Sequence, residues 1–233
     1  MFHTKVAPGL GGMLLSPAHE EQARSGSRRR TYEPVKRALD ILLSGSALLV
    51  LLPVFLAIWI AVRRDGGPAF FGHDRIGRNG RSFPCLKFRS MVPDANSVLA
   101  KLLAEDPEAA RQWNQTRKLT RDPRITRLGR FLRASSLDEL PQLINVLQGD
   151  MSLVGPRPVV QEELDRHYGS HAAAYLSVRP GITGLWQASG RSNTSYEARV
   201  AMDCQYVTEL SLRNDLLIML RTVPAVLKRT GAH

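Results

Sequence analysis

The pattern of hydrophobic and polar positions separates one uncharged apolar segment from a longer remainder that mixes apolar and charged residues. Residues 41–62 carry no charged side chain, and these 22 residues match the roughly 20 apolar residues that a helix needs to cross a bilayer core. A buried core helix is the alternative, but helices of soluble proteins usually keep a polar stripe, and every face of this segment is apolar. The pattern therefore predicts a membrane-embedded helix.

Basic residues and a proline distinguish two membrane arrangements. Lys36 and Arg37 precede the apolar segment, and Arg63 and Arg64 follow it. Because basic residues prefer the cytoplasmic side, a simple span would place one of these pairs on the unfavourable side. Pro53 lies near the centre, where it removes a backbone hydrogen bond and can bend the helix. These features favour a re-entrant helix-break-helix, with both ends on the cytoplasmic face, over a full span.

The remainder of the chain predicts a compact, mostly helical α+β domain with a small sheet. Residues 83–91 alternate in the manner of a strand, and residues 94–119 have the composition of a helix or helical pair. Apolar residues recur at helical spacing over 125–132, and residues 207–228 form an amphipathic, apolar-rich stretch. We therefore expect a flexible basic cytoplasmic tail (1–31), a re-entrant membrane hairpin (32–66) and a compact membrane-associated domain (67–233).

The charge of the chain indicates an anionic partner, because the formal net charge is +11 and the pI is near 10.3. Nucleic acid, phospholipid headgroups and phosphorylated substrates all fit this charge. The sequence has no helix-turn-helix, RNA-binding aromatic signature or zinc finger, so no nucleic acid is expected as a partner. The two cysteines lack a CxxC spacing, which favours a reduced cytoplasmic setting over a chance disulfide. The six histidines lack metal-ligand spacing, which argues against zinc.

Four basic residues are candidates for binding phosphate. Lys87 and Arg89 share one face of the predicted strand, where two cations can hold a phosphate, although charges that protect an edge strand are the simpler explanation. Arg157 stands between two prolines, and Arg179 opens a loop rich in proline and glycine. Such stiff loops can present fixed donors to phosphate oxygens, but each is also compatible with an ordinary surface turn.

An acidic pair, Asp138 and Glu139, lies where a helix is predicted to begin. Ser136 and Glu139 match a capping box, whereas Pro141 favours a helix that starts at about residue 140 or 141 with a carboxylate near its cap. Both alternatives place Asp138 at or beside a helix N-terminus, where the helix dipole stabilises its charged form. Taken by itself, this pattern requires no more than helix capping.

Four motifs follow one another along the chain: 87–91 (KFRSM), 133–142 (RASSLDELPQ), 145–158 (NVLQGDMSLVGPRP) and 179–187 (RPGITGLWQ). Together they resemble the bacterial sugar transferases, which are monotopic polyprenyl-phosphate phosphoglycosyl transferases. The resemblance runs in order from about Val35 to the C-terminus, and motifs this long rarely coincide by chance. Without a large N-terminal membrane domain, the chain is similar to the short members that initiate exopolysaccharide synthesis.

The resemblance implies an enzyme that transfers a sugar-1-phosphate from a UDP-sugar to polyprenyl (undecaprenyl) phosphate and releases UMP. In the family the aspartate of the Asp-Glu pair is the nucleophile, which forms a covalent aspartyl phosphosugar, and the glutamate binds magnesium. Asp138 and Glu139 inherit these roles, and Mg²⁺ is the expected cofactor. An arginine five residues before the aspartate is implicated in phosphate binding, which indicates Arg133. Further neutralisation of phosphate charge is expected from Lys87, Arg89, Arg157 and Arg179.

The family also implies a location. Its membrane segment is a re-entrant helix-break-helix, which supports Pro53 as the break and a place on the cytoplasmic face of the bacterial inner membrane, in contact with membrane lipids. Leu52 precedes Pro53 where the family often has serine, and His73 stands where a glutamine is common.

An inactive scaffold of polysaccharide assembly is the alternative function, against which the intact Asp138-Glu139 pair argues. A homo-oligomer is compatible with the sequence, and the sugar is not identified by it.

Overall fold

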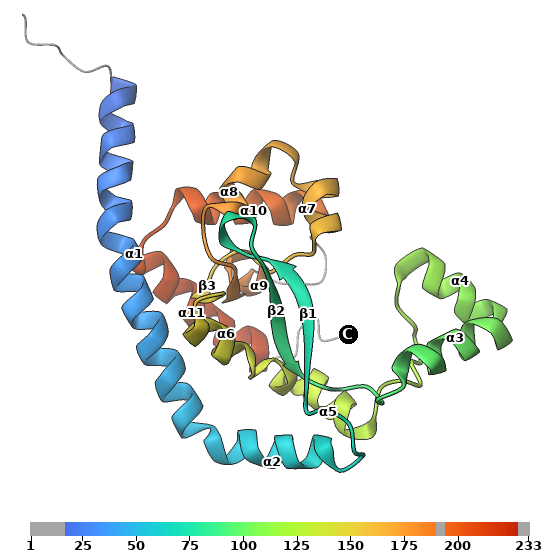
Figure 1. Ribbon diagram of the computed structural model, residues 1–233. Coiled ribbons are helices and arrows are strands. Elements are labelled where there is room, and N and C mark those ends of the chain that lie inside the picture. The colour runs from blue at the N-terminus through green and yellow to red at the C-terminus, as the bar shows by residue number, and fades with distance from the viewer. Residues whose placement is uncertain (1–16, 190–193, 228–233) are drawn as a thin grey trace, which may run out of the picture.

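The computed structural model describes residues 17–189 and 194–227, which form a mostly helical fold with two small sheets (Figure 1). The α-helices are α1 (Pro17–Val50), α2 (Leu52–Arg63), α3 (Ala95–Glu105), α4 (Pro107–Thr116), α5 (Arg127–Ser135), α6 (Gln142–Gln148), α7 (Gln161–His167), α8 (Ala172–Leu176), α9 (Leu185–Ala188), α10 (Tyr196–Thr208) and α11 (Leu212–Leu227). Short 3₁₀ turns are η1 (Arg78–Gly80), η2 (Leu137–Glu139) and η3 (Gly169–His171). The strands are β1 (Phe70–Ile76), β2 (Ser82–Phe88), β3 (Ser152–Val154) and β4 (Gly181–Thr183). The mostly helical α+β class is confirmed.

Helices α1 and α2 form a bent pair along one side of the molecule (Figure 1). Residues 31–50 of α1 meet α2 at 66°, with Leu51 between the two helices. Pro53 lies in the first turn of α2 and has no N–H to donate to residue 49, so the bend falls beside the residue expected as the break. Among the described residues, no single helix is long and apolar enough to cross a membrane, whereas the bent pair meets both requirements when its halves are taken together.

The N-terminal part of α1 differs from the sequence prediction. A flexible tail was expected over residues 1–31, but residues 17–31 are helical. Alanine, glutamate, glutamine and arginine make up most of this stretch, and these good helix formers extend the helix that follows them. The rest of the expected tail, residues 1–16, lies outside the described residues.

The outer edge of β2 is completed by a side chain instead of a further strand. Strands β1 and β2 are antiparallel, and the fully buried Asn145 of α6 lies against the other edge of β2. Asn145 Oδ1 accepts the N–H of Leu86 at 2.9 Å, and Asn145 Nδ2 donates to the carbonyl of Pro84 at 2.9 Å. A buried group left without such a partner costs about 1–3 kcal/mol. Asn145 therefore fixes α6 on the hairpin, and with it the turn that precedes α6.

Helix α2 packs against the end of β2 and against the chain around η2. Ile58 and Val62 of α2 are buried in one cluster with Leu132 of α5. Leu137, the first residue of η2, and Leu140, which follows η2, are partly buried against the same cluster. The second half of the bent pair is therefore in direct contact with the segment that carries the acidic pair.

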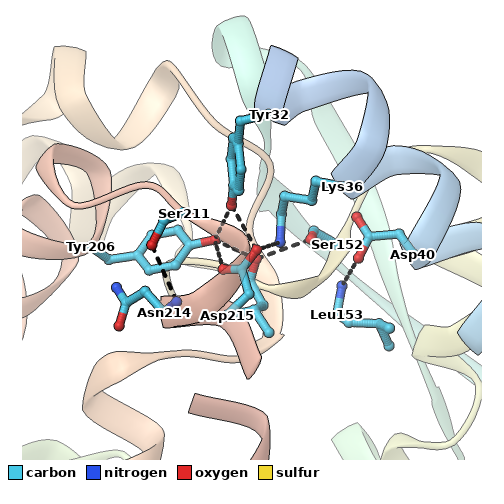
Figure 2. A network of polar contacts seen from close by, with 10 residues as sticks. Tyr32, Lys36, Asp40, Ser152, Leu153, Tyr206, Ser211, Asn214 and Asp215 are labelled. Carbon is cyan, nitrogen blue, oxygen red and sulfur yellow. Dashed lines mark hydrogen bonds and ion pairs between the residues drawn. The ribbon is translucent and has the colours of Figure 1, made fainter. Parts of the chain in front are cut away.

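A buried carboxylate fastens α1 to the body of the protein (Figure 2). Asp215 of α11 accepts a hydrogen bond from the hydroxyl of Tyr32 at 2.7 Å and pairs with Nζ of Lys36 at 2.9 Å. The hydroxyl of Tyr206, from α10, lies 2.9 Å from the other oxygen of the same carboxylate. One turn further along α1, Asp40 accepts the middle N–H of β3 at 3.0 Å. Three helices and a strand thus meet at the middle of α1.

Helices α3 and α4 project from the body as a helical pair (Figure 1), which confirms the prediction for residues 94–119. Asp106 stands alone between them and caps α4, because its side chain accepts the N–H groups of Glu108 and Ala109 at 2.9 and 3.1 Å. The pair connects β2 to α5. It is therefore inserted between the two segments of chain that build the site.

Candidate active site

The acidic pair lies in η2, a tight turn between α5 and α6. Ser136 ends α5 in the left-handed region, with φ of 57°, so the chain changes direction there. The Ser136 side chain makes no capping hydrogen bond at η2, and the capping box is not formed. Helix α6 begins at Gln142 with Pro141 as its N-cap and without a side-chain capping hydrogen bond, slightly later than the start at residue 140 or 141 that the alternative interpretation expected. Asp138 and Glu139 therefore occupy successive positions of a turn that is fixed at both ends.

Lys87 of β2 joins the acidic pair. Its Nζ lies 2.6 Å from Glu139 Oε1 and 3.8 Å from Asp138 Oδ2. Asp138 is buried, whereas the side chains of Lys87 and Glu139 each keep 39% of their surface exposed. One ammonium group thus faces two carboxylates in a site that is closed around Asp138 and open beside it.

Burial raises the pKa of Asp138 above its ordinary value, whereas the charges of Lys87 and Arg133 lower it and that of Glu139 raises it. The pKa of Lys87 is itself raised. Burial alone would lower that pKa, but the charge of Glu139, the hydrogen bond to it and the charge of Asp138 outweigh burial. Lys87 therefore stays protonated, and its charge favours the ionised form of Asp138.

Arg133 comes from the last turn of α5 and acts on the same carboxylate. Its Nε donates to Oγ of Ser90 at 2.8 Å, and its charge lowers the pKa of Asp138 against the effect of burial. Helix α5 passes so close to Ser90 that a Cβ at Gly129 would lie 1.9 Å from the Ser90 carbonyl oxygen. Only glycine allows this approach, which holds α5 against the segment that follows Lys87.

Two further arginines extend the positive region along the hairpin. Nη1 of Arg157 and Nη1 of Arg75 lie 3.4 and 3.6 Å from the same oxygen of Glu163. Burial raises the pKa of Cys85, and the charges of both arginines lower it. Cys85 precedes Lys87 by two positions on the same face of β2. Arg157 therefore lies on the side of the hairpin that carries Cys85 and Lys87, and its ion pair is with Glu163.

Arg75 was missed by the sequence analysis. In the register of the hairpin, Arg75 lies opposite Phe83 and Phe71 opposite Lys87, so Phe71, His73 and Arg75 share the face that carries Lys87. The alternation of β1 is hidden because polar residues occupy both faces of this largely exposed strand. The end of β1 has the sequence Arg75-Ile76-Gly77, and this Arg-x-Gly pattern was the signal that could have identified Arg75.

Arg89 does not face the acidic pair. It is buried, its Nη1 binds Asp65 Oδ2 at 2.8 Å, and the bond lowers the pKa of Asp65. Its other hydrogen bonds go to the carbonyls of Val62, Pro68 and Met91. Strand β2 ends one residue earlier, so the alternation that placed Arg89 on the same face as Lys87 no longer holds. This geometry favours a structural function, because it ties the end of α2 to the end of β2.

Arg179 also lies away from the acidic pair. Its Nε donates to the carbonyl of Gly149 at 2.8 Å, at the end of the hairpin opposite to Lys87. The structure therefore gathers part of the expected set around the acidic pair and leaves two members elsewhere. Lys87 and Arg133 lie at the acidic pair, Arg157 lies further along the same side of the hairpin, and Arg89 and Arg179 are placed elsewhere.

The acidic pair provides oxygen ligands of the kind that a divalent cation prefers. Within residues 17–189 and 194–227, no three His, Cys, Asp or Glu side chains are grouped so that they could hold a metal ion alone. Mg²⁺ needs no such group, because it is usually bound by one or two carboxylates together with substrate phosphates and waters. Asp138 and the partly exposed Glu139 fit that requirement.

Residues 31–229 match the family of bacterial sugar transferases, and this range includes the four motifs. The chain belongs to this family. It is 51% identical over 205 residues to the undecaprenyl-phosphate galactose phosphotransferase of Salmonella typhimurium. It is 51% identical over 199 residues to the UDP-galactose-lipid carrier transferase of Erwinia amylovora, and 52% over 210 residues to the exopolysaccharide production protein ExoY of Rhizobium meliloti.

These matches cover most of this chain but different shares of the relatives. They span 88%, 85% and 90% of the chain for the Salmonella, Erwinia and Rhizobium proteins, respectively. The chain covers only 43% and 42% of the first two proteins, and 92% of ExoY. The family that the motifs predicted is thus confirmed.

Separate replacement of Arg89 and Arg133 by alanine should distinguish an arginine that stabilises the fold from one that is available to bind substrate. We expect Arg89→Ala to destabilise the fold by about 2–3 kcal/mol, or roughly 4–12 °C in the thermal unfolding midpoint, because it strips buried carbonyls and Asp65 of their partner. Arg133→Ala should change the midpoint by about 2 °C or less, since Arg133 is exposed. Differential scanning fluorimetry of the purified variants measures both values. Equal losses in the two variants would contradict this division.

Proposed function

We propose that this chain transfers a sugar-1-phosphate from a UDP-sugar to undecaprenyl phosphate, with Asp138 as the nucleophile. The observation that carries the proposal is a buried Asp138 carboxylate with Glu139 beside it and the charges of Lys87 and Arg133 acting on it. The names of the Salmonella and Erwinia relatives, which specify undecaprenyl phosphate or a lipid carrier, support the same kind of transfer. The product, a polyprenyl diphosphosugar, would begin the synthesis of an exopolysaccharide or another surface glycan.

The transfer takes place in two displacements. A carboxylate oxygen of Asp138 attacks the β-phosphorus of the UDP-sugar, the bridging P–O bond breaks, and its electron pair leaves with UMP. The phosphosugar stays on Asp138 as an acyl phosphate. An oxygen of polyprenyl phosphate then attacks the same phosphorus, and the bond from the carboxylate oxygen to phosphorus breaks. This second step forms the diphosphate and restores the free carboxylate.

The basic residues around η2 reduce the repulsion between a carboxylate and two anionic substrates. The charge of Lys87 lowers the pKa of Asp138 against the raising effect of burial, and so favours the ionised form that a nucleophile needs. Arg133 donates to Ser90 through Nε alone, and its Nη atoms have no acceptor among the side chains and backbone of residues 31–189 and 194–224. Arg157 lies further along the hairpin, where it is suited to the more distant part of the donor.

Glu139, with phosphate oxygens and water, would hold Mg²⁺. When bound, the cation neutralises charge on the diphosphate and on the departing UMP. The half-exposed side chain of Glu139 supports this assignment, because a ligand shared with substrate must be accessible from solvent.

The bent pair supports a position at the cytoplasmic face of the bacterial inner membrane. Its exposed surface carries large apolar side chains, which include Leu42, Leu49, Val50, Leu56 and Ile60. An apolar surface of this extent favours contact with lipid, and the 66° bend suits a hairpin that stays in one leaflet. Because α2 packs on η2, a polyprenyl phosphate in that leaflet would lie beside the acidic pair.

UDP-galactose is the first donor to test. The names of the Salmonella and Erwinia relatives, each 51% identical to this chain, specify galactose. A panel that adds UDP-glucose and UDP-N-acetyl sugars, with UMP release as the readout, identifies the donor without any assumption about the pathway.

The covalent step can be tested with the donor alone. Without polyprenyl phosphate, the enzyme should release about one UMP per active site and retain a phosphosugar on the peptide that contains Asp138. Asp138→Asn should abolish both signals, because an amide keeps the shape but is a feeble nucleophile. Intact-mass analysis and proteolysis detect the adduct. Release of UMP only when both substrates are present, without an adduct, would favour direct transfer, and no release with any donor would favour an inactive scaffold.

The metal assignment can be tested with Glu139→Gln. An amide oxygen is a weaker ligand for Mg²⁺ than a carboxylate, so turnover should fall and half-maximal activity should require more Mg²⁺. Raised Mg²⁺ should restore part of the rate. Glu162→Gln is a matched control, since Glu162 is exposed on α7 and pairs only with Arg166. A loss of activity that Mg²⁺ does not relieve, with an unchanged Mg²⁺ dependence, would count against Glu139 as a ligand.

The hairpin predicts that both of its ends face the cytoplasm. In a chain whose native cysteines are replaced by alanine, Ser25→Cys and Arg64→Cys should both be protected from an impermeant maleimide in intact spheroplasts. Both should react after permeabilisation. Labelling of one site alone before permeabilisation would establish a full span. Pro53→Ala should straighten the pair and increase the labelled fraction at one of the two sites.

A further inference from the structure

A second group of arginines surrounds a cavity at the turn between β1 and β2. The cavity has a volume of about 200 Å³. Arg78, Asn79 and Arg81 line it from the turn, and Asp150 and Arg179 line it from the facing loops. Three guanidinium groups against one carboxylate give the lining a positive balance, which suits an anionic ligand.

The fold leaves much of this hydrogen-bonding capacity unused. Arg179 donates through Nε to Gly149, and its two Nη atoms have no acceptor among residues 31–189 and 194–224, whose side chains the structure describes. The exposed side chain of Arg81 makes neither a hydrogen bond nor an ion pair with any residue in those ranges. Arg78 pairs with Glu33 of α1 at 3.0 Å, through a contact that is one-third exposed on each side. Several guanidinium donors are therefore available to a ligand in the cavity.

A fourth arginine adds to the same positive region. Arg37 donates to the last carbonyls of α6 and lines a smaller neighbouring cavity, of about 30 Å³, together with Arg78 and Arg179. Burial and the charges of Arg37 and Arg78 lower the pKa of Arg179, against a smaller opposite effect of Asp40 and Glu33. The nearby acids thus leave part of the mutual repulsion of the arginines in place. A bound anion would relieve it.

We propose that the cavity at the β1–β2 turn binds a phosphate-bearing anion at a site separate from Asp138. Guanidinium groups bind phosphate oxygens through paired hydrogen bonds, and Arg81 and Arg179 approach the cavity from two different segments. The turn and Lys87 are separated by the length of β2, roughly 20 Å for six residues of strand. An anion bound there is therefore not the phosphate that reacts.

An anion bound in this cavity would connect segments that are distant in the sequence. The anion would connect the hairpin turn to the loop after α6 and to the residue that leads into β4. Arg78 extends this connection to α1 through Glu33. Two sources could supply the phosphate group, namely a soluble phosphate ester and the headgroup of a phospholipid.

Calorimetric titration of the full-length protein in detergent, with pyrophosphate as the probe, tests the proposal. Arg78→Gln/Arg81→Gln should weaken pyrophosphate binding by about tenfold, and Arg81→Gln alone, which removes no contact of the fold, by about threefold. The matched control is Arg111→Gln/Arg166→Gln, because these exposed arginines only pair with carboxylates on their own helices. The control should bind pyrophosphate as the unmodified protein does.

A second titration, with short-chain phosphatidylglycerol, identifies the source of the phosphate. Weaker binding of pyrophosphate by the double variant supports a site for a soluble phosphate ester. Weaker binding of phosphatidylglycerol alone supports a site for a lipid headgroup. Unchanged binding of both probes by the double variant, or equal losses in the control, overturns the proposal. Neither readout requires turnover, so the result does not depend on the transfer reaction.

Discussion

The packing of α2 against the end of β2 and the residues around η2 joins the bent helix pair, α1 and α2, to the acidic pair. Leu137 and Leu140 stand on either side of that pair and bury part of their surface against Ile58 and Val62. The helix that was expected to lie in lipid is thus also one wall of the core beneath the site. Arg89 strengthens the same junction, because it donates to the carbonyl of Val62 in the last turn of α2. Displacement of α2 would therefore disturb the carboxylates directly.

The site holds Asp138 between two opposing effects. Burial disfavours the charged form of its carboxylate and raises its pKa, because a buried carboxylate is poorly hydrated. Lys87 supplies the compensating charge from a different segment of the chain, and Gly129 allows α5 to approach closely enough to bring Arg133 to the same turn. The electrostatics of one carboxyl group consequently depend on backbone contacts that carry no charge.

Motifs and local periodicity were sufficient to predict part of the candidate site from the sequence. The motifs indicated Asp138 and Glu139 as a pair, and strand alternation placed Lys87 on one face of β2 with Cys85, the face on which the structure brings Lys87 to Glu139. Alternation failed at Arg89, because β2 ends one residue before it, and a strand boundary depends on tertiary pairing. The capping box failed at Ser136, whose left-handed conformation serves to end α5.

Other features depended on contacts between distant segments, which local pattern does not encode. Asn145 completes the edge of β2 from a helix that lies about sixty residues further along the chain. Arg75 joins the site only through the register of the hairpin, and Arg179 is directed elsewhere by the carbonyl of Gly149. The helical extension over residues 17–31 was underestimated, since composition alone does not reveal that a long helix continues into it.

Because α1 is attached to the body of the protein near its midpoint, a displacement of one end of the helix is coupled to a displacement of the other. Its 34 residues extend for roughly 50 Å, and the contacts of Tyr32, Lys36 and Asp40 with the body lie near the centre of that length. A sideways load on the part of α1 before Tyr32 would tilt the other part, which ends at Val50, in the reverse direction. The carboxylate of Asp215 holds α1 at the point about which it would tilt. Its replacement by a neutral residue would weaken the contacts with Tyr32 and Lys36 and leave both ends of α1 unchanged.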